Sequence, residues 1–296
     1  MTTGSKTVSV FFGNITSASE KACSYLGSRE HQLVGAAEVH LCKRKAGKVR
    51  RKFESEGWKT TMSQVVQSQR SEKGILGGVL GLAKKHLATR SLRKISSLSE
   101  TLHSSTDYCG FLWRLSGLTV AVIFAYMESG VGLNGNASKL CKLAQLLAAL
   151  GFPYLVLADW NFEAEELVSS GWVHRCNGFI LEPSNSSWTC SSGTKRVLDF
   201  GVADVRLRHL VVSCRAVFTG PWGPHLGLEV ILRVQPEVVK VRVLEGRDAF
   251  REGDRRLGVD DANGQQATWE EAKKYAEEVG GGSKSFVAEE PAAVFK

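Results

Sequence analysis

A buried strand is predicted by Tyr154-Leu155-Val156-Leu157-Ala158-Asp159-Trp160-Asn161-Phe162, where an apolar run that starts just after Pro153 stops at an acid and an amide. The run is short and its residues tolerate burial on both faces, which is typical of a central strand in a sheet covered on both sides. Because side chains alternate along a strand, we expect Asp159 and Asn161 to point the same way and to converge on one substrate atom. A strand followed by an Asx turn is the alternative interpretation.

The chain has 296 residues, of which 43% are apolar and 23% are charged, as in ordinary globular proteins. This length suits one large α/β domain or two small ones, and we expect one domain over residues 7–235. From about Leu244 the sequence is rich in charges of both signs and poor in apolar residues, which predicts a flexible tail over residues 244–296. Thr268-Trp269-Glu270-Glu271 matches a capping box and predicts one short helix in that tail.

The formal net charge of +8 favours polyanionic partners. Seven of the ten residues at 43–52 are Lys or Arg. Nucleic acid is the partner that such a run suggests first. A solvated basic loop or a basic targeting signal is the alternative.

The seven cysteines are scattered and include no Cys-x-x-Cys pair, so neither a disulfide framework nor a thiolate zinc site is predicted. We expect free thiols in a reducing compartment. The N-terminus lacks the long apolar core of a signal peptide, and the most hydrophobic segment, residues 115–126, is too short to span a bilayer. We therefore expect an intracellular protein that is nuclear and does not enter a membrane.

Other short runs of β-branched and aromatic residues predict further strands. They lie at residues 8–12, 33–39, 115–126, 197–205, 209–218 and 226–234, and the Gly-rich segment 74–82 reads as a tightly packed strand. Helices are predicted at residues 17–27, at 137–150 between the cap Asn136 and the stop Gly151, and at 163–170. This order predicts an α/β (α+β) fold, a two-layered β-sandwich flanked by helices.

Polar residues stand at or just after the ends of these apolar runs. They are Asn14, Glu38, Tyr126, Asp159, Asn161, Asp199 and His225. Their order resembles the endonuclease/exonuclease/phosphatase superfamily, and in particular the apurinic endonuclease-like domains of non-LTR retrotransposons. The matching motifs, spread over about residues 7–235, are Gly13-Asn14-Ile15, Val34-Gly35-Ala36-Ala37-Glu38, Gly77-Gly78-Val79, Phe124-Ala125-Tyr126, Leu157-Ala158-Asp159-Trp160-Asn161-Phe162, Val197-Leu198-Asp199-Phe200 and Pro224-His225-Leu226-Gly227-Leu228.

The resemblance implies a four-layer fold and a Mg²⁺-dependent phosphodiester hydrolase, in the form of a retroelement-derived endonuclease domain that cuts DNA. It implies that Glu38 binds Mg²⁺, with Mn²⁺ as the alternative ion, since carboxylates suit these cations. Asp159 would orient the attacking water or accept its proton, and Asn161 would help to hold that water and the phosphate.

The same resemblance gives roles to the other four residues. His225 would donate to a phosphate oxygen, and Asp199 would fix the orientation of His225 and favour its cationic form. Tyr126 and Asn14 would contact the phosphate or tune the metal site. Taken singly, each of these residues is more often structural than catalytic.

Three positions depart from the family pattern. Pro224 stands where an acid usually precedes the histidine, Ala158 stands where glycine is usual, and Thr16 stands where an acid often follows the first asparagine. Loss of one metal carboxylate weakens metal affinity without always abolishing activity. Two alternatives to the nuclease therefore stay open, namely a catalytically decayed nucleic-acid-binding member of the same fold and a phosphatase acting on phosphate esters. The sequence does not indicate an oligomeric state.

Overall fold

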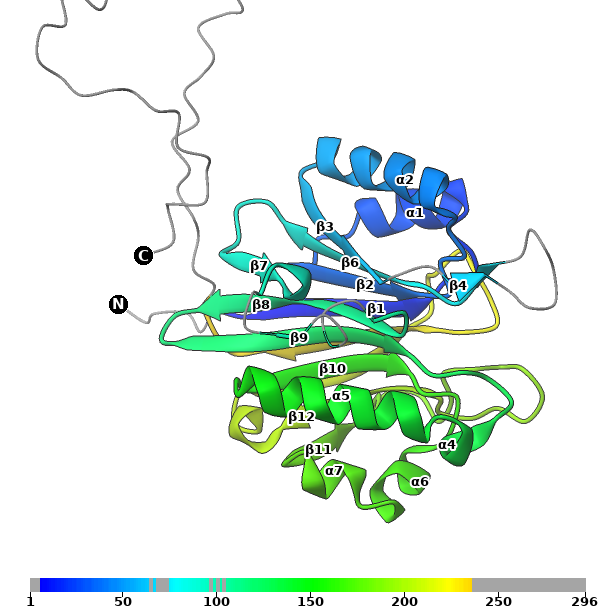
Figure 1. The fold of residues 1–296 in the computed structure, drawn as a ribbon, viewed down its shortest axis with the longest axis vertical. Helices are drawn as coiled ribbons and strands as arrows, with labels where there is room; N and C mark the ends of the chain where they lie inside the picture. Colours follow the sequence, from blue (N-terminus) through cyan, green and yellow to red (C-terminus); the bar gives the residue numbers. More distant parts are fainter. Residues whose placement is uncertain are drawn as a thin grey trace, which may run out of the picture. The chain divides into compact units, whose positions relative to one another are not determined.

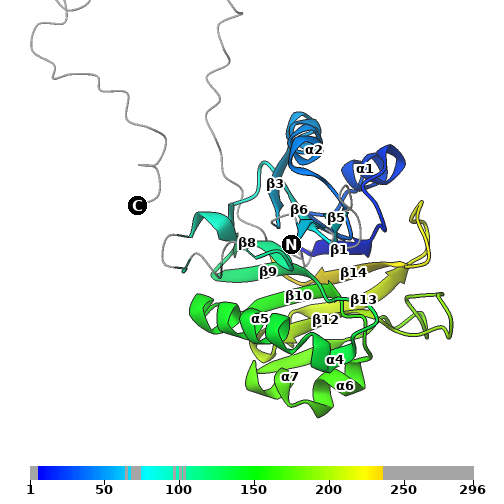
Figure 2. The same cartoon turned by 45° about the vertical axis from the view of Figure 1, so that its right-hand side comes forward.

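The computed structural model describes residues 6–63, 66–67, 75–95, 98–99, 102 and 105–235. In this part of the chain two six-stranded sheets lie face to face, and helices cover both outer faces (Figures 1 and 2). The predicted sandwich of two sheets flanked by helices is confirmed. The predicted tail at 244–296, with its capping box, lies outside the described residues.

The first sheet is mixed, because β1 pairs in parallel with β2 and antiparallel with β14. In spatial order its strands are β13 (Val211–Val217), β14 (Gly227–Leu232), β1 (Val8–Asn14), β2 (Leu33–Ala37), β6 (Val79–Lys84) and β3 (Trp58–Met62). A separate two-stranded sheet consists of β4 (Val66–Gln67) and β5 (Ile75–Leu76).

The second sheet is also mixed, because β10 pairs in parallel with β9 and antiparallel with β12. Its strands in spatial order are β11 (Gly178–Leu181), β12 (Asp199–Asp204), β10 (Tyr154–Asp159), β9 (Leu118–Tyr126), β8 (Tyr108–Leu115) and β7 (Thr89–Ser91). The predicted strand at the centre of the chain is therefore an inner strand of this sheet.

The helices form the two outer layers (Figure 1). Helices α1 (Glu20–Gly27) and α2 (Lys43–Ser55) pack on the first sheet. The second sheet carries α5 (Ala137–Leu150), α6 (Ala164–Ser169) and α7 (Trp172–Arg175), preceded in the chain by the short α4 (Gly132–Gly135). Two 3-10 turns, η1 (Leu92–Lys94) and η2 (Val205–Leu207), follow β7 and β12. No helix in the described ranges is long and apolar enough to cross a membrane.

All six residues of β10 are buried, which confirms the prediction of a strand covered on both faces. Leu155 and Leu157 belong to the core between the two sheets, and Val156 and Ala158 belong to the core beneath the helices. Full burial of each Leu or Val side chain contributes about 1.5–3 kcal/mol to folding before entropy is counted. The strand therefore holds its end, Asp159, in a fixed place.

The basic run at residues 43–52 is not a loop. It forms most of α2, because Ala46, Val49 and Phe53 recur at helical spacing and pack against the outer face of the first sheet. Phe53 is fully buried there. The apolar positions are few and well separated in sequence, so the surrounding charges conceal the helical period.

Two predicted strands have different limits in the structure. The run at 115–126 belongs to two strands, because β8 ends at Leu115 and the chain turns at Gly117, whose φ is +72°, before β9 starts at Leu118. The segment 74–82 is divided at Gly77 and Gly78, whose φ values of +59° and +90° end β5 and precede β6.

The predicted helices at 137–150 and 163–170 are confirmed, and Gly151 ends α5 in the left-handed conformation. The helix expected at 17–27 starts only at Glu20, because the Ser19 hydroxyl oxygen accepts a hydrogen bond from the Ala22 N–H and caps it. The expected side-chain cap at Asn136 is wrong. The Asn136 amide instead bonds the backbone of Glu128 at 2.8 and 3.0 Å and fixes the loop after β9.

The predicted strands at 197–205, 209–218 and 226–234 are confirmed as β12, β13 and β14, each within narrower limits. All seven cysteines are free thiols, as expected.

Candidate active site

Strand ends from both sheets meet at one edge of the sandwich. In the second sheet Asp159, the last residue of β10, lies opposite Tyr126 of β9 and Asp199 of β12. In the first sheet Asn14 ends β1 opposite Ala37, the residue before Glu38. Register therefore aligns three of the predicted residues in the second sheet and two in the first, and hydrogen bonds between the sheets bring the two groups together.

Asp159 is fully buried and well supplied with hydrogen bonds. Its Oδ2 accepts from Asn14 Nδ2 at 2.8 Å and from Asn161 Nδ2 at 2.9 Å. Its Oδ1 accepts from the backbone N–H of Asn161 at 3.2 Å. The Asn14 bond crosses from the first sheet to the second, so the two sheets share this carboxylate.

Asn161 reaches Asp159 by a route other than the predicted alternation. The strand ends at Asp159, and Asn161 has a left-handed φ of +56°, which turns its side chain back. The bond from its backbone N–H to the Asp159 side chain is the Asx contact of the alternative interpretation. Its Nδ2 also donates to the Met127 carbonyl at 2.8 Å, which anchors the amide. The two side chains thus contact each other directly, in addition to the Asx contact, and their convergence on a substrate atom stays a prediction.

His225 and Asp199 form a buried pair. His225 Nδ1 lies 2.8 Å from Asp199 Oδ2, and the backbone N–H of Asp199 donates to Thr189 Oγ1 at 2.8 Å. The other oxygen, Asp199 Oδ1, is buried without a hydrogen-bond partner among the described residues. A buried carboxylate oxygen of this kind is costly unless something else satisfies it.

Glu38 follows β2 with a left-handed φ of +54°, which directs this segment away from the strand. Its Oε1 accepts a hydrogen bond from the Tyr126 hydroxyl at 2.8 Å. Glu38 comes from the first sheet and Tyr126 from the second. This is a second polar contact between the sheets at the same edge.

Burial and neighbouring charges alter the pKa values of the site. Burial first, and then the charge of Asp199, raise the pKa of Asp159. Burial alone would lower the pKa of His225, but the charge and hydrogen bond of Asp199 raise it to about 9. The Glu38 charge adds to the rise at Asp159 and at His225, so these groups share one electrostatic environment. Burial, followed by Glu38, also raises the pKa of Tyr126.

The site has donor groups suited to a cation. One ligand atom from each of Asp159, Asp199 and His225 lies within 4.8 Å of the others. Carboxylate oxygens are the ligands that Mg²⁺ and Mn²⁺ prefer, whereas an imidazole suits softer transition metals better. The unpartnered Asp199 Oδ1 adds a free buried oxygen. The residues present therefore fit a divalent cation.

The structure adds two residues that the sequence did not single out. Thr189 is fully buried, and its hydroxyl oxygen accepts from the backbone N–H groups of Leu198 and Asp199 at 2.9 and 2.8 Å. Met127 supplies the carbonyl that holds Asn161. A single Thr in a Ser-rich stretch and a backbone carbonyl have no sequence signature.

Pro224 offers no side-chain ligand, and its carbonyl accepts from Ser191 N and Oγ, each at 3.1 Å.

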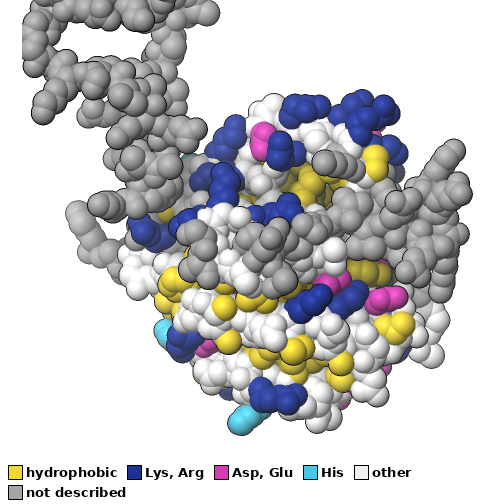
Figure 3. All heavy atoms as spheres, in the orientation of Figure 1, with side chains coloured by type: hydrophobic (Ala, Val, Ile, Leu, Met, Phe, Trp, Pro, Cys, Tyr) yellow, Lys and Arg dark blue, Asp and Glu magenta, His cyan; other side chains and the backbone are white. Residues whose placement is uncertain are grey.

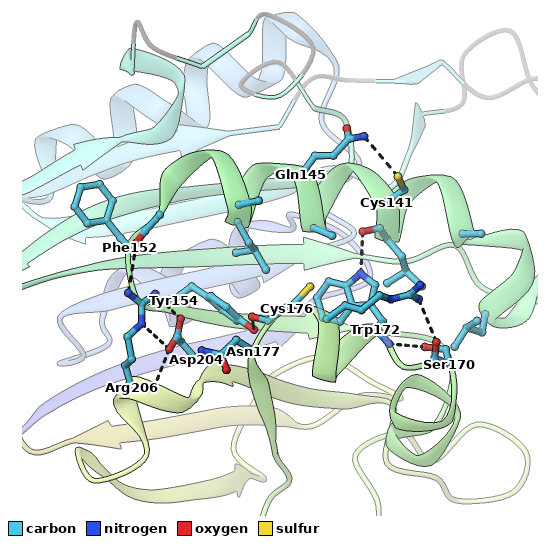
Figure 4. Close-up of a pocket in the computed structure, with 18 residues that line it drawn as sticks. Cys141, Gln145, Phe152, Tyr154, Ser170, Trp172, Cys176, Asn177, Asp204 and Arg206 are labelled. Atoms are coloured by element: carbon cyan, nitrogen blue, oxygen red, sulfur yellow. Dashed lines mark hydrogen bonds and ion pairs between the residues drawn. The ribbon is translucent and has the colours of Figure 1, made fainter.

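A cavity of about 710 Å³ lies elsewhere, on the helix side of the second sheet (Figure 4). Its apolar wall comes mainly from α5, and it contains none of the predicted site residues. Its charged pair is already satisfied, because Arg206 donates to both oxygens of Asp204 at 2.8 and 2.6 Å. This cavity lacks the free acids and bases that hydrolysis requires, so the strand-end cluster is the candidate active site.

No family model matches the sequence, and no curated protein matches it either. Several solved structures are similar. The AP endonuclease LMAP from Leishmania major aligns with a TM-score of 0.61 and 14% identity, over 77% of this chain and 88% of that one. The endonuclease domain of TRAS1, a telomere-specific non-LTR retrotransposon, aligns with a TM-score of 0.59 and 13% identity, over 78% of this chain and 100% of that one. The human Nocturnin catalytic domain aligns with a TM-score of 0.56 and 14% identity, over 77% of this chain and 94% of that one.

The three structures share the architecture of two facing sheets with outer helices, at identities too low to carry an activity across. The chain therefore has the endonuclease/exonuclease/phosphatase fold.

Proposed function

We propose that this protein is a divalent-metal-dependent phosphodiesterase that cuts DNA, and that it is an endonuclease domain of retroelement origin. The observation that carries the proposal is the buried Asp159 carboxylate, held by Asn14 and Asn161 and lying beside the Asp199–His225 pair. Phosphodiester hydrolysis needs a base for water, donors for the phosphate and positive charge where negative charge develops. The cluster supplies a candidate for each need.

Asp159 is the candidate proton acceptor. A base works best when its pKa lies near the working pH, and burial together with the Asp199 charge raises the pKa of Asp159 in that direction. The amides of Asn14 and Asn161 fix one of its oxygens, Oδ2, from two sides. The carboxylate is therefore oriented before the substrate arrives, and no reorganisation is needed during the reaction.

His225 is the candidate donor to a phosphate oxygen. Asp199 holds the ring through Nδ1, which leaves Nε2 for the substrate. A pKa of about 9 keeps the ring protonated at neutral pH, so it can donate a charge-assisted hydrogen bond. Asp199 acts through His225 and is a positioning residue.

Glu38 would hold Mg²⁺ or Mn²⁺, since its carboxylate oxygens suit these ions. The bound cation supplies charge that stabilises the negative phosphate oxygens. The Tyr126 hydroxyl donates to Glu38 and orients it for that task.

DNA is the proposed substrate for two reasons. The formal charge of +8 favours a polyanion, and two of the similar structures are an AP endonuclease and a retrotransposon endonuclease domain. A DNA substrate would place the protein in the nucleus.

A decayed nucleic-acid-binding protein is the second candidate, and Pro224 is the observation that favours it. An acid usually precedes the histidine of this motif. Here Pro224 precedes His225, and the proline ring cannot ligate a metal. In that case the cluster would persist for the stability of the sandwich edge. A phosphatase built on the same fold would keep the cluster but would act on monoesters.

A substrate panel separates these candidates. Purified protein is incubated with supercoiled plasmid, an abasic duplex, single-stranded RNA and a phosphate monoester, each in Mg²⁺, in Mn²⁺ and in chelator. The proposal predicts chelator-sensitive cutting of the DNA substrates. Release of phosphate from the monoester alone would establish the phosphatase. Duplex binding without cutting in either metal would establish the decayed protein.

A further inference from the structure

Helix α2 presents a row of three bases to solvent. Arg44, Lys48 and Arg51 recur at spacings of four and three residues, which places them on one face of the helix. The opposite face is the apolar one, where Phe53 is buried against the first sheet. Lys and Arg side chains gather over α2 at the top of the molecule (Figure 3). We call these three residues the α2 row.

The charges of the α2 row are available to a partner. All three side chains are exposed. No ion pair or hydrogen bond joins them to any residue in the described part of the chain, whereas Arg50 pairs with Glu54 at 3.7 Å on another face of the helix. A row of unneutralised charge repels itself and is stabilised by an anion.

The helix is fixed with its first turn near the candidate active site. Lys43 is five positions after Glu38 along the chain, a reach of at most about 18 Å. The segment between them is held, because Val39 N and His40 N donate to the Gly78 and Gly77 carbonyls at 3.2 and 3.0 Å. From that edge the 13-residue helix runs for about 20 Å over the outer face of the first sheet (Figure 1).

We infer that the α2 row binds the phosphate backbone of duplex nucleic acid outside the site of cleavage. The row is about 10 Å long, which matches the axial rise of about three phosphates on one strand. Contacts of this kind bind without reading sequence and position a duplex along the protein. The inference takes its class of ligand from the proposed function, but it concerns binding and needs no catalysis.

An anionic membrane is the less suitable partner. Helices that lie in a membrane interface expose an apolar face together with their bases. The apolar face of α2 is packed inward, and the large exposed hydrophobic residues among those described are all on other elements: Val131, Phe152, Val168, Val212 and Phe218. The surface of α2 offers charge without an apolar anchor.

The test compares two triple variants of equal charge loss. Arg44→Gln/Lys48→Gln/Arg51→Gln removes the α2 row, and Lys142→Gln/Arg215→Gln/Arg233→Gln removes three exposed bases elsewhere. Glutamine keeps good helix propensity, so α2 should stay folded, as circular dichroism can verify. Affinity for a duplex of about 30 base pairs is measured by fluorescence anisotropy in chelator over a range of salt concentrations.

We expect the α2-row variant to bind about tenfold more weakly at low salt, and the slope of log K against log salt to fall by about 3, while the control variant resembles wild type. Equal effects of the two variants, or none from the first, would overturn the inference. The inference would also be overturned if the α2-row variant lost binding to phosphatidylserine vesicles while its duplex affinity stayed at the wild-type value. If wild type has a steeper slope of log K against log salt than the α2-row variant but cuts no substrate, the proposed function would be refuted and this inference would be supported.

Discussion

The buried cluster of Asp159, Asp199 and His225 brings opposite charges together, and it dominates the electrostatics of the site. Asp159 and Asp199 are fully buried, and the pKa of each is raised by burial. His225 is the cation that faces them.

The stability of the metal-free protein should fall as pH rises from 6.5 to 9.5. The pKa of His225 rises from its ordinary 6.5 to about 9, so its stabilising pair is complete below pH 6.5 and is lost as pH rises through 9. The raised pKa of Asp159 acts in the same sense, because the unfolded chain releases this proton at a lower pH than the buried carboxyl does. We expect the free energy of unfolding in urea with chelator to drop over this range, with a contribution from His225 of about 3 kcal/mol at most. In His225→Gln the drop should shrink, and an unchanged drop in that variant would show that other groups cause it.

Tyr126→Phe should weaken metal-dependent activity without unfolding the protein. The change removes the hydroxyl that donates to Glu38 at 2.8 Å. Loss of such an orienting bond costs about 10- to 100-fold in metal affinity or activity, so the Mg²⁺ concentration for half-maximal nicking should rise. Tyr25→Phe is the matched control, since its hydroxyl bonds Thr219 outside the site at 2.7 Å. Identical Mg²⁺ titrations for wild type and Tyr126→Phe would contradict the role of the Tyr126 hydroxyl in orienting Glu38.

At the scale of elements, the site depends on how closely the two sheets approach each other. Phe124 of β9 lies against Gly35 of β2, and a Cβ at position 35 would overlap its ring. The same two strands end in Tyr126 and just before Glu38. Close packing at Gly35 therefore sets the distance that the Tyr126–Glu38 hydrogen bond spans.

Gly35→Ala should destabilise the protein by about 1–3 kcal/mol, because the added methyl group forces the sheets apart. Gly47→Ala in α2 is the control: its nearest neighbour is Arg51 Nη1 at 4.0 Å, and alanine should stabilise the helix by about 0.5–1 kcal/mol. Urea unfolding measures both changes. Equal stability of Gly35→Ala and wild type would mean that the sheets tolerate a wider separation.

The sequence predicted those elements whose pattern is local. The burial of β10 on both faces and the end of α5 at Gly151 could be predicted, because an apolar run and a left-handed glycine are features of a few consecutive residues. Strand β3 does not stand out in the sequence because only Trp58 and Met62 of its five residues are apolar, and β11 does not because it is only four residues long. The pairing of these strands to β6 and β12 is set by distant residues.

The same limit applies to the site. Strand-end acids and amides could be found from the sequence, because an apolar run that stops at a polar residue is visible. Their partners could not, because the Asn14–Asp159 bond joins residues 145 positions apart and the Thr189 hydroxyl bonds only backbone N–H groups. The roles of the seven predicted residues stay predictions.

At the scale of the whole molecule, neither sheet contains a complete site. Asn14 and Glu38 come from the first sheet, and Tyr126, Asp159 and Asp199 come from the second. Unfolding of either sheet should therefore abolish activity together with stability. The proposed domain limit near residue 235 stays a prediction, because residues 236–296 lie outside the part that the structure describes.

The central claim is that the Asp159 cluster hydrolyses phosphodiesters. The most direct measurement is the rate of nicking of supercoiled plasmid by wild type, Asp159→Asn and Asp204→Asn, in Mg²⁺ and in chelator. Asp204 is the control because it is a buried aspartate at the other end of β12, paired with Arg206, and thermal unfolding verifies that each variant is folded. We predict nicking by wild type and Asp204→Asn only with Mg²⁺, and a rate about 1,000-fold lower for Asp159→Asn. Nicking by Asp159→Asn at the wild-type rate, or none by wild type, would contradict the claim.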